Sequence, residues 1–456
     1  MQELMIDLNT LYSNKRTGIN NPVVNGDPRT DFQRDYDRII FSSAFRRLQN
    51  KTQVFPLPGS VFVHNRLTHS LEVSSVGRSL GNLIGEFIAD KFDKQLNTES
   101  KLFYRYDLIN VIAAACLCHD IGNPAFGHSG EDAIVCFFRN NESHLKPFFS
   151  DNEWCDLINF EGNANAIRVL THQQKGKSEG GLMLTYSTLA SIAKYPCEST
   201  GKDKSVLHRK KFGFFQSEKN TFTDIAESTG MIQQSDEPVT FLRHPFVWLV
   251  EAADDICYNI IDFEDAHRIG IVEHSNCIDL LLSLIESNEE ESGKTTARLE
   301  SISDKNEQVT FLRAKAINTL ITKSKSIFEQ NVESFINGTF NKPIFDCIKE
   351  CNSELTDIID FSREHIYNNR QVVEIENAGY NVINELLVHF IPPMLKNNRT
   401  NAEEKAIRLI PIAFNYDGAS PYERVMGVLD YISGMTDNYI TDLYRRIKGI
   451  DMGRVF

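Results

Sequence analysis

Residues 116–132, "CLCHDIGNPAFGHSGED", place His119 directly before Asp120 at the point where an apolar segment ends. Two ionisable side chains at the end of a buried helix lose much of their hydration energy unless another group compensates them. A metal ion is a common compensating group, because imidazole nitrogens and carboxylate oxygens are both ligands of divalent first-row ions. The pair therefore predicts part of a metal site, whose other ligands must come from elsewhere in the chain.

Two other segments offer the same residue types. "RLTHS" carries His69 near a helix start, and "EAADDICYNIID" carries Asp254 and Asp255 in an otherwise apolar helix. Together with the His-Asp pair they form a set that suits an octahedral ion such as manganese, iron, cobalt, nickel or magnesium. Such a site leaves coordination positions for water or for phosphate oxygens. The mixed nitrogen and oxygen donors disfavour a sulfur-rich structural zinc site.

The third segment also predicts the wall of a pocket. Asp254, Tyr258 and Asp262 follow one another at i, i+4 and i+8, so they share one face of a helix. This spacing makes Asp254, rather than Asp255, the expected ligand. A sugar would satisfy the other two residues, with its ring packed against Tyr258 and a hydroxyl bound to Asp262.

The elements that must position these side chains are helices, because apolar residues recur with helical rather than alternating spacing over most of the chain. We expect an amphipathic helix from Thr68, a central buried helix over 108–119 and a long helix from His244. Residues 173–240 are polar and broken by Gly and Pro. The fold class predicted is mostly α, in one main body with irregular insertions.

Two capping boxes mark helix starts. Thr30 and Gln33 predict one that opens a helix through "DFQRDYDRIIFSSAFRRL". Ser420 and Glu423 predict another, which opens a helix through "SPYERVMGVLDYISGMTDNYITDLYRRIKG" that Gly449 ends.

Charge and composition exclude several classes of protein. The chain has 456 residues and a net charge of −14, which disfavours a surface that coats nucleic acid, because phosphate binding needs summed positive charge. A small anionic substrate stays compatible, provided that a few Lys and Arg side chains converge in one pocket. The longest apolar run, 108–118, is too short to span a bilayer. "MQELMIDLNTLY" shows no signal peptide and the nine cysteines lack a framework spacing, so we expect a reduced cytoplasmic protein with buried thiols.

Further motifs surround these residues in a characteristic order. They are "RLQNKTQVFPL", "NRLTHSLEV", "CHDIGNPAFGHSGEDAI", "FEGNANAIR", "KKFGFFQSE", "EAADDICYNIIDFEDA" and "DYISGMTDNYITDLY". On these stretches the chain resembles the HD superfamily, and within it the dGTPase-like deoxynucleoside triphosphate triphosphohydrolases. The resemblance implies a mostly α fold over 1–456, an HD-domain helical core with its metal site over 30–280, helical and loop insertions, and a helical C-terminal part over 281–456.

The resemblance also implies roles for single residues. The family's metal ligands match His69, His119, Asp120 and Asp254. Its catalytic pair matches His128 and Glu131, which lie on one helical turn, where the carboxylate can orient the imidazole. The family's substrate contacts, to phosphates, sugar and neighbouring polar groups, match Gln53, Arg66, Asn123, Asn163, Lys211, Tyr258 and Asp262.

The reaction implied by the resemblance is hydrolysis of a dNTP, dGTP foremost, at the α-phosphorus, which releases a deoxynucleoside and intact tripolyphosphate. The implied cofactor is one divalent metal ion: Mn²⁺, Mg²⁺ or another first-row ion. Further partners implied are an activator nucleotide or single-stranded DNA, and other copies of the chain in a hexamer or tetramer, but no membrane. A 2′-deoxy sugar would be preferred if Tyr258 packs where a 2′-hydroxyl would project.

Two other interpretations stay open on the sequence. The chain could be another HD nucleotide phosphohydrolase or phosphodiesterase, which product analysis would separate. It could also be a nucleotide-sensing or single-strand nucleic-acid-binding module without turnover, and a nucleic-acid role predicts salt-sensitive binding that persists without the metal.

Overall fold

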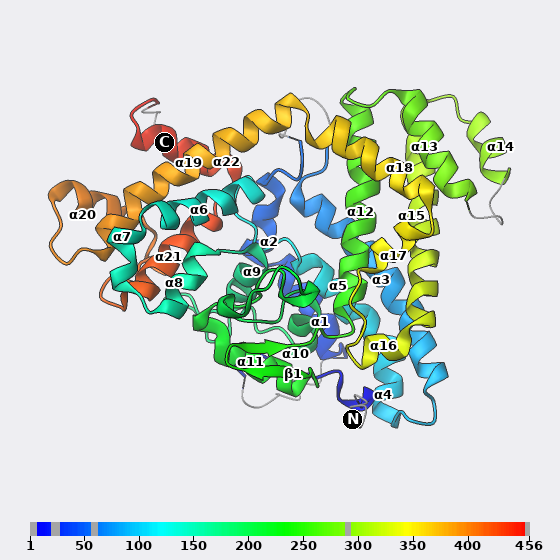
Figure 1. The fold of residues 1–456 in the computed structure, drawn as a ribbon, viewed down its shortest axis with the longest axis horizontal. Coiled ribbons are helices and arrows are strands. Elements are labelled where there is room, and N and C mark those ends of the chain that lie inside the picture. Colours follow the sequence, from blue (N-terminus) through cyan, green and yellow to red (C-terminus); the bar gives the residue numbers. More distant parts are fainter. Residues whose placement is uncertain (1–6, 20–27, 56–62, 288–292, 452–456) are drawn as a thin grey trace.

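Three long helices carry or directly precede the predicted metal ligands. They are α3 (Arg66–Lys91), α5 (Leu108–Cys118) and α12 (Val247–Arg268) in a computed structural model of the chain. Helix α3 packs against both α5 and α12 (Figure 1). The helix predicted from Thr68 begins at Arg66, and the one predicted from His244 begins at Val247.

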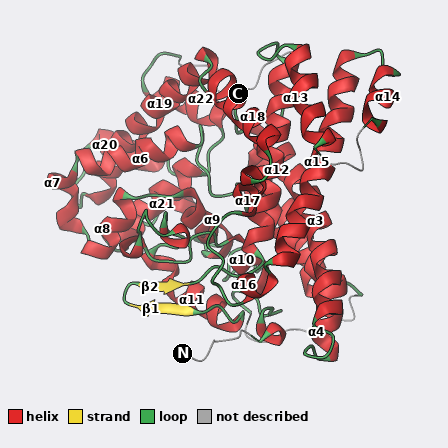
Figure 2. Ribbon diagram, turned by 45° about the vertical axis from the view of Figure 1, so that its right-hand side comes forward, coloured by secondary structure: helices red, strands yellow, loops and turns green. Residues whose placement is uncertain are grey.

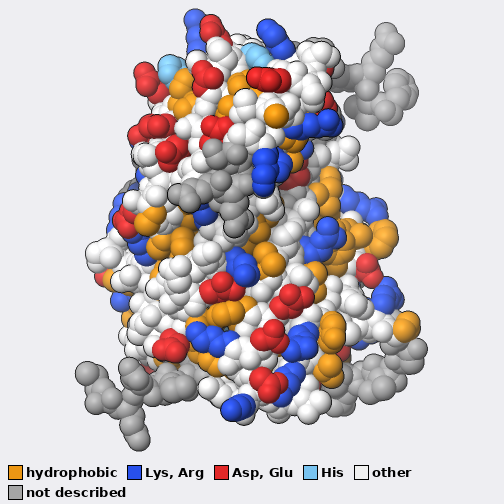
Figure 3. Space-filling model, turned by 90° about the vertical axis from the view of Figure 1, so that its right-hand side faces the viewer, with side chains coloured by type: hydrophobic (Ala, Val, Ile, Leu, Met, Phe, Trp, Pro, Cys, Tyr) orange, Lys and Arg blue, Asp and Glu red, His pale blue; other side chains and the backbone are white. Residues whose placement is uncertain are grey.

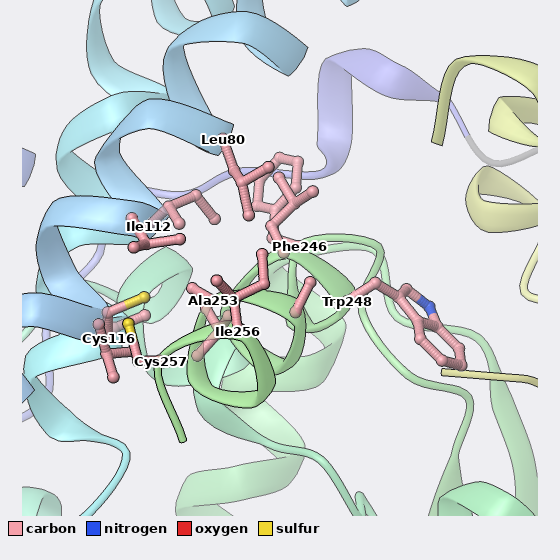
Figure 4. Close-up of a cluster of buried hydrophobic side chains, with 14 of the residues drawn as sticks. Leu80, Ile112, Cys116, Phe246, Trp248, Ala253, Ile256 and Cys257 are labelled. Carbon is pink, nitrogen blue, oxygen red and sulfur yellow. The ribbon is translucent and has the colours of Figure 1, made fainter. Parts of the chain in front are cut away.

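The apolar faces of these helices meet in the middle of the molecule. Figure 4 shows side chains from the three helices close together: Leu80, Ile112, Cys116, Ala253, Ile256 and Cys257. Nearly every side chain of α5 is buried, as its apolar composition predicts. Burial of one large aliphatic side chain contributes about 1.5–3 kcal/mol, so this contact fixes the ends of the helices, where the polar residues lie.

The structure describes residues 7–19, 28–55, 63–287 and 293–451. Parts of the stretches "MQELMIDLNTLY" and "RLQNKTQVFPL" lie outside these ranges. The other α-helices are α1 (Asp31–Ile40), α2 (Ser43–Arg47), α4 (Thr98–Leu102), α6 (His128–Asn140), α7 (Glu142–Leu145), α8 (Asp151–Ile158), α9 (Gly162–Thr171), α10 (Tyr186–Ile192), α11 (Lys219–Ser228), α13 (His274–Glu286), α14 (Lys294–Glu300), α15 (Lys305–Gln330), α16 (Val332–Ile336), α17 (Ile344–Glu350), α18 (Ser353–Ser362), α19 (Arg370–Leu395), α20 (Asn401–Arg408), α21 (Pro421–Ser433) and α22 (Asp437–Ile447).

The predicted fold class, mostly α with an HD-domain helical core, is confirmed. Within the described ranges the strands are β1 (Gln233–Asp236) and β2 (Val239–Phe241), which pair antiparallel (Figure 2). They lie in the segment 173–240 that the sequence marks as broken. All nine cysteines are free thiols, and Cys116 and Cys118 are buried.

Buried apolar side chains form two clusters. The first is built largely on α3, α5, α12, α13 and α15, and the second on α6, α8, α19, α21 and α22. The chain passes from one to the other between α5 and α6, since Ile121 belongs to the first cluster and Ala125 to the second. The loop that follows the His-Asp pair is therefore held from both sides. The division at residue 281 stays a prediction.

Both capping boxes are present, but each predicted helix is broken. The boxes at Thr30 and Ser420 have both reciprocal hydrogen bonds. The first predicted helix divides into α1 and α2, because the Ser42 hydroxyl accepts from the N–H of Phe45 and starts a new helix. The second divides into α21 and α22, because Thr436 caps α22 in the same way.

The surface carries charges of both signs. On the face drawn in Figure 3, acidic and basic side chains are mixed, and acidic ones gather in its upper part. Among the described residues, no helix combines the length and the apolar character that a membrane crossing requires.

Candidate active site

Two histidines and an aspartate from the three long helices converge on one point. The ligand atoms of His69, His119 and Asp254 all lie within 4.8 Å of one another. Nε2 of His69 is 3.3 Å, and Nε2 of His119 is 3.4 Å, from Oδ1 of Asp254. Asp255, the neighbouring carboxylate, is not part of this group. The group combines the donor types that divalent first-row ions prefer.

The tautomer of His119 favours a metal ligand. Its Nδ1 lies 2.7 Å from the carbonyl oxygen of Cys116, and because a carbonyl only accepts, Nδ1 must carry the proton. Nε2 is then a bare lone pair, and it has no hydrogen-bond partner among the described residues. A backbone carbonyl that fixes the outer ring nitrogen is the usual support of a metal-binding histidine.

Asp254 stays ionised in its buried position. Burial alone would raise the pKa of Asp254, but its neighbours His119, Lys194 and the hydrogen-bonded His69 hold this pKa well below its ordinary value. Lys194 places its Nζ 3.2 Å from Oδ2 of Asp254. In contrast, burial and the nearby Glu251 raise the pKa of Asp255 well above its ordinary value. Asp254 is thus the anionic carboxylate of the pair.

Asp120 stands at the edge of this group. Its Oδ2 lies 3.6 Å from Nε2 of His119 and accepts a 2.8 Å hydrogen bond from Nη1 of Arg66. Nδ2 of Asn123 donates to the other carboxylate oxygen at 2.5 Å. Arg66 and Asn123, both predicted as substrate contacts, therefore hold a predicted ligand in place here.

A cavity of about 440 Å³ opens over the group. Most of the predicted site residues line it: Gln53, Arg66, His119, Asp120, Asn123, His128, Glu131, Asn163, Lys211, Asp254 and Tyr258. His69 and Asp262 do not line the cavity and lie buried behind its wall. Oε1 of Gln53 is buried and has no hydrogen-bond partner among the described residues. The long-range fold thus brings together residues that the sequence scatters over several segments.

His128 and Glu131 begin helix α6 beside the cavity. Nδ1 of His128 is 3.0 Å from Oε2 of Glu131, and the side chain of His128 is 83% exposed. The other oxygen of Glu131 accepts a 2.7 Å hydrogen bond from the N–H of Gly162 at the start of α9. Gly127 precedes His128 with a φ of +57°, and a Cβ there would lie 2.6 Å from Nη2 of Arg66. Only glycine lets the guanidinium approach the loop this closely.

Three cationic side chains line the cavity: Arg66, Lys194 and Lys211. Lys211 donates to Oε1 of Glu161 at 2.8 Å, and Nδ2 of Asn163 donates to the same oxygen at 2.7 Å. Lys194 was not predicted from the sequence, because the short motif around it, "AKYP", carries no chemical signal by itself.

Tyr367 was also missed. Its ring stacks on that of Tyr258, with centroids 5.3 Å apart and an interplanar angle of 4°. Its hydroxyl donates to Oδ2 of Asp262 at 3.3 Å. Burial raises the pKa of Asp262 to about 7. Tyr367 belongs to a π-helical turn, Arg363–Tyr367, and no local pattern announces its approach to α12.

Comparisons with known proteins agree with this arrangement. The HD domain family matches residues 66–179, and the phosphohydrolase-associated domain family matches residues 347–446. Proteins called deoxyguanosinetriphosphate triphosphohydrolase-like are similar over nearly the whole length. One from Synechocystis sp. is 37% identical over 97% of this chain and 99% of its own. Others from Pseudomonas aeruginosa and Listeria monocytogenes are 35% identical (97% of this chain, 99% of the relative) and 34% identical (93% and 95%). The chain belongs to this dGTPase-like family and is an HD-domain phosphohydrolase.

Proposed function

We propose that the protein is a metal-dependent dNTP triphosphohydrolase that cleaves at the α-phosphorus and releases a deoxynucleoside and tripolyphosphate. The observation that carries this proposal is that the His69, His119 and Asp254 group and the His128–Glu131 pair meet at one cavity. The name shared by the relatives supports dGTP as the first substrate to test.

The residues present fit one divalent ion. His69, His119 and Asp254 would hold it, with Asp120 as a further ligand once its carboxylate turns from Arg66. When bound, the ion would polarise the α-phosphate and acidify a bound water. Manganese, magnesium or another first-row ion suits this mixture of nitrogen and oxygen donors.

His128 is the proposed general base or acid. The hydrogen bond that Nδ1 of His128 donates to Glu131, followed by the charge of that carboxylate, raises the pKa of His128 above its ordinary value despite some opposing burial. Glu131 also fixes the ring, because its second oxygen is tied to the N–H of Gly162. We propose that the exposed Nε2 of His128 takes a proton from the attacking water or delivers one to the leaving oxygen.

The cations of the cavity are the proposed polyphosphate site. Arg66, Lys194 and Lys211 each hold a carboxylate here, so their charged ends are already fixed in place. Phosphate oxygens would replace those carboxylates as partners. Because phosphoryl transfer depends mainly on positioning and charge neutralisation, fixed cations are what the reaction requires.

The stacked tyrosines are the proposed sugar site. Tyr258 is partly exposed to the cavity, and Tyr367 backs it and binds Asp262. This layer leaves Asp262 behind the aromatic wall rather than at the cavity surface. We therefore propose that the tyrosine pair meets the sugar first, and that Asp262 acts on the sugar through the hydroxyl of Tyr367.

The test is an assay of metal-stripped protein against each dNTP and GTP, with Mn²⁺ or Mg²⁺ restored and the phosphate products resolved. Tripolyphosphate with deoxynucleoside is the expected result, lost in Asp254→Ala. Asp255→Asn is the matched control, since the raised pKa of Asp255 means that the amide replaces a carboxyl that is already neutral. This control should keep metal binding.

Other results point elsewhere. Orthophosphate or pyrophosphate as the product would refute cleavage at the α-phosphorus and favour another HD phosphohydrolase. If no single nucleotide is hydrolysed, a second nucleotide or single-stranded DNA is added to the assay. If hydrolysis is still absent, a binding module is favoured. Homo-oligomerisation as a tetramer or hexamer, also proposed from the family resemblance, is measured by light scattering on the same preparation.

A further inference from the structure

The carboxylate of Asp437 joins two segments that line the cavity. Asp437 is the first residue of α22, and its side chain is buried. One oxygen, Oδ2, accepts a 2.8 Å hydrogen bond from the N–H of Thr52. The other, Oδ1, accepts a 3.2 Å hydrogen bond from the N–H of Phe126. Thr52 precedes Gln53, and Phe126 is two residues before His128, so one side chain outside the cavity holds both segments.

Phe126 adopts an unusual backbone conformation that its surroundings have to maintain. Its φ is +60°, in the left-handed region that bulky residues seldom occupy. Such conformations persist only where neighbouring groups hold them. Besides the bond to Asp437, the Phe126 ring packs on α19 at Gly379, where a Cβ would lie 2.3 Å from Cγ of the ring. Asp437 and Gly379, on different helices, thus set the same kink just before α6 begins.

A second contact runs in parallel. Nζ of Lys51 is buried and donates to the carbonyl oxygens of Asn123 at 2.6 Å and Ser433 at 2.8 Å. Lys51 and Thr52 are consecutive, and Asn123 and Phe126 belong to the same loop. The two contacts therefore tie the same pair of segments to the C-terminal helices. Neither Lys51 nor Asp437 lines the cavity, so both hold its lining segments from outside.

We propose that Asp437 is a positioning residue of this enzyme: through Phe126 and Thr52 it sets where His128 and Gln53 stand relative to each other. The inference rests on the proposed function for the role of His128 and Gln53. It gives α22, which does not line the cavity, a part in the reaction.

The main variant is Asp437→Asn, which keeps the shape but leaves only one oxygen acceptor, so the amide group must face one of the two N–H donors. We expect kcat for dNTP hydrolysis to fall about 10- to 100-fold, because small displacements of a catalytic group have effects of this size. The pH midpoint of kcat should not move, since His128 and Glu131 stay together on α6.

Gly379→Ala is the second variant, because it displaces Phe126 from the other side and changes no charge. It should show the same fall in kcat with the same unmoved midpoint. Asp442→Asn is the matched control: Asp442 lies on α22 as well, is 61% exposed and should leave kcat unchanged. Thermal unfolding of each variant shows that the measured protein is folded.

Hydrogen exchange followed by mass spectrometry gives a readout that needs no activity. In Asp437→Asn, peptides covering 48–55 and 120–128 should exchange about tenfold faster or more, because they lose a charged acceptor. If the wild type hydrolyses no dNTP, the proposed function fails while this measurement still tests the contact. The inference is overturned if exchange is unchanged or if kcat is unchanged. It is also overturned if the pH midpoint shifts, which would mean that Asp437 acts through its charge.

Discussion

Replacing Glu131 by Gln tests how the candidate catalytic pair works. Glu131 accepts from Nδ1 of His128 through one oxygen and from the N–H of Gly162 through the other. Glutamine keeps one acceptor and places an amide group against the remaining donor. The substitution therefore removes the negative charge that stabilises the imidazolium and loosens the ring, while it leaves the shape of the side chain and the rest of α6 intact.

The size of the effect follows from the geometry. A hydrogen bond to a charged group contributes about 1.5–3 kcal/mol. Because the His128 side chain is 83% exposed, solvent screening reduces this to roughly 0.5–1 kcal/mol. Loss of this stabilisation should lower the pKa of His128. The sign is fixed: Glu131 raises this pKa, so its removal makes the neutral imidazole persist to lower pH.

The assay is kcat for dNTP hydrolysis from pH 5 to 9 at saturating metal. The pH midpoint assigned to His128 should move down in Glu131→Gln, and the plateau should fall about 10- to 100-fold because the imidazole is no longer oriented. Asp132→Asn, an exposed neighbour on α6, should change neither quantity. A pH midpoint that stays in place or moves upward would refute the assigned role of the pair, whatever the plateau value of kcat.

Three further expectations follow from other parts of the molecule. Tyr258→Ala should raise the ratio of GTP to dGTP turnover about tenfold or more, since room for one more small group on the substrate, here the 2′-hydroxyl, shifts selectivity by about this much. Burial lowers the pKa of Lys51 to about 7, against roughly 10.4 in an unfolded chain. Between these two pKa values the folded protein binds fewer protons than the unfolded chain. The free energy of unfolding of the wild type should therefore rise with pH relative to that of Lys51→Met. Urea unfolding at pH 7.5 and 8.5 should show about 1 kcal/mol of this difference. Asp430→Asn should cost about 3 kcal/mol of unfolding free energy, because Arg168, bound to both Asp430 oxygens at 2.8 Å, keeps only Glu218 as an acidic partner.

Local sequence predicted those parts of the fold that local energetics decides. The capping boxes at Thr30 and Ser420 are present because both partners lie within one turn. The breaks at Ser42 and Thr436 were also encoded locally, since each is a residue type that caps helices. Apolar periodicity runs through both breaks, however, so periodicity alone predicted one helix where the structure has two.

The residues of the candidate site were likewise predictable only in part. Residues that stand in recognisable motifs, such as His119, were found from the sequence. Lys194 and Tyr367 were not, because their place depends on how distant segments pack. Tyr367 reaches Asp262 across 105 residues of sequence, and Asp437 reaches Thr52 across 385. No composition or spacing rule reports a contact of that range, and only the folded chain brings these residues together.

The charges of the cavity explain how a chain of net charge −14 can present a site for a polyanion. Each lysine or arginine that lines the cavity is paired: Arg66 with Asp120, Lys194 with Asp254, and Lys211 with Glu161. The acids hold the cations in place without substrate. Lys194 contacts Oδ2 of Asp254, whereas His69 and His119 face Oδ1, so the two oxygens of this carboxylate would serve the lysine and a divalent ion separately. The acidic residues around the cavity are therefore compatible with an anionic substrate, because they fix the cations that would meet its phosphates.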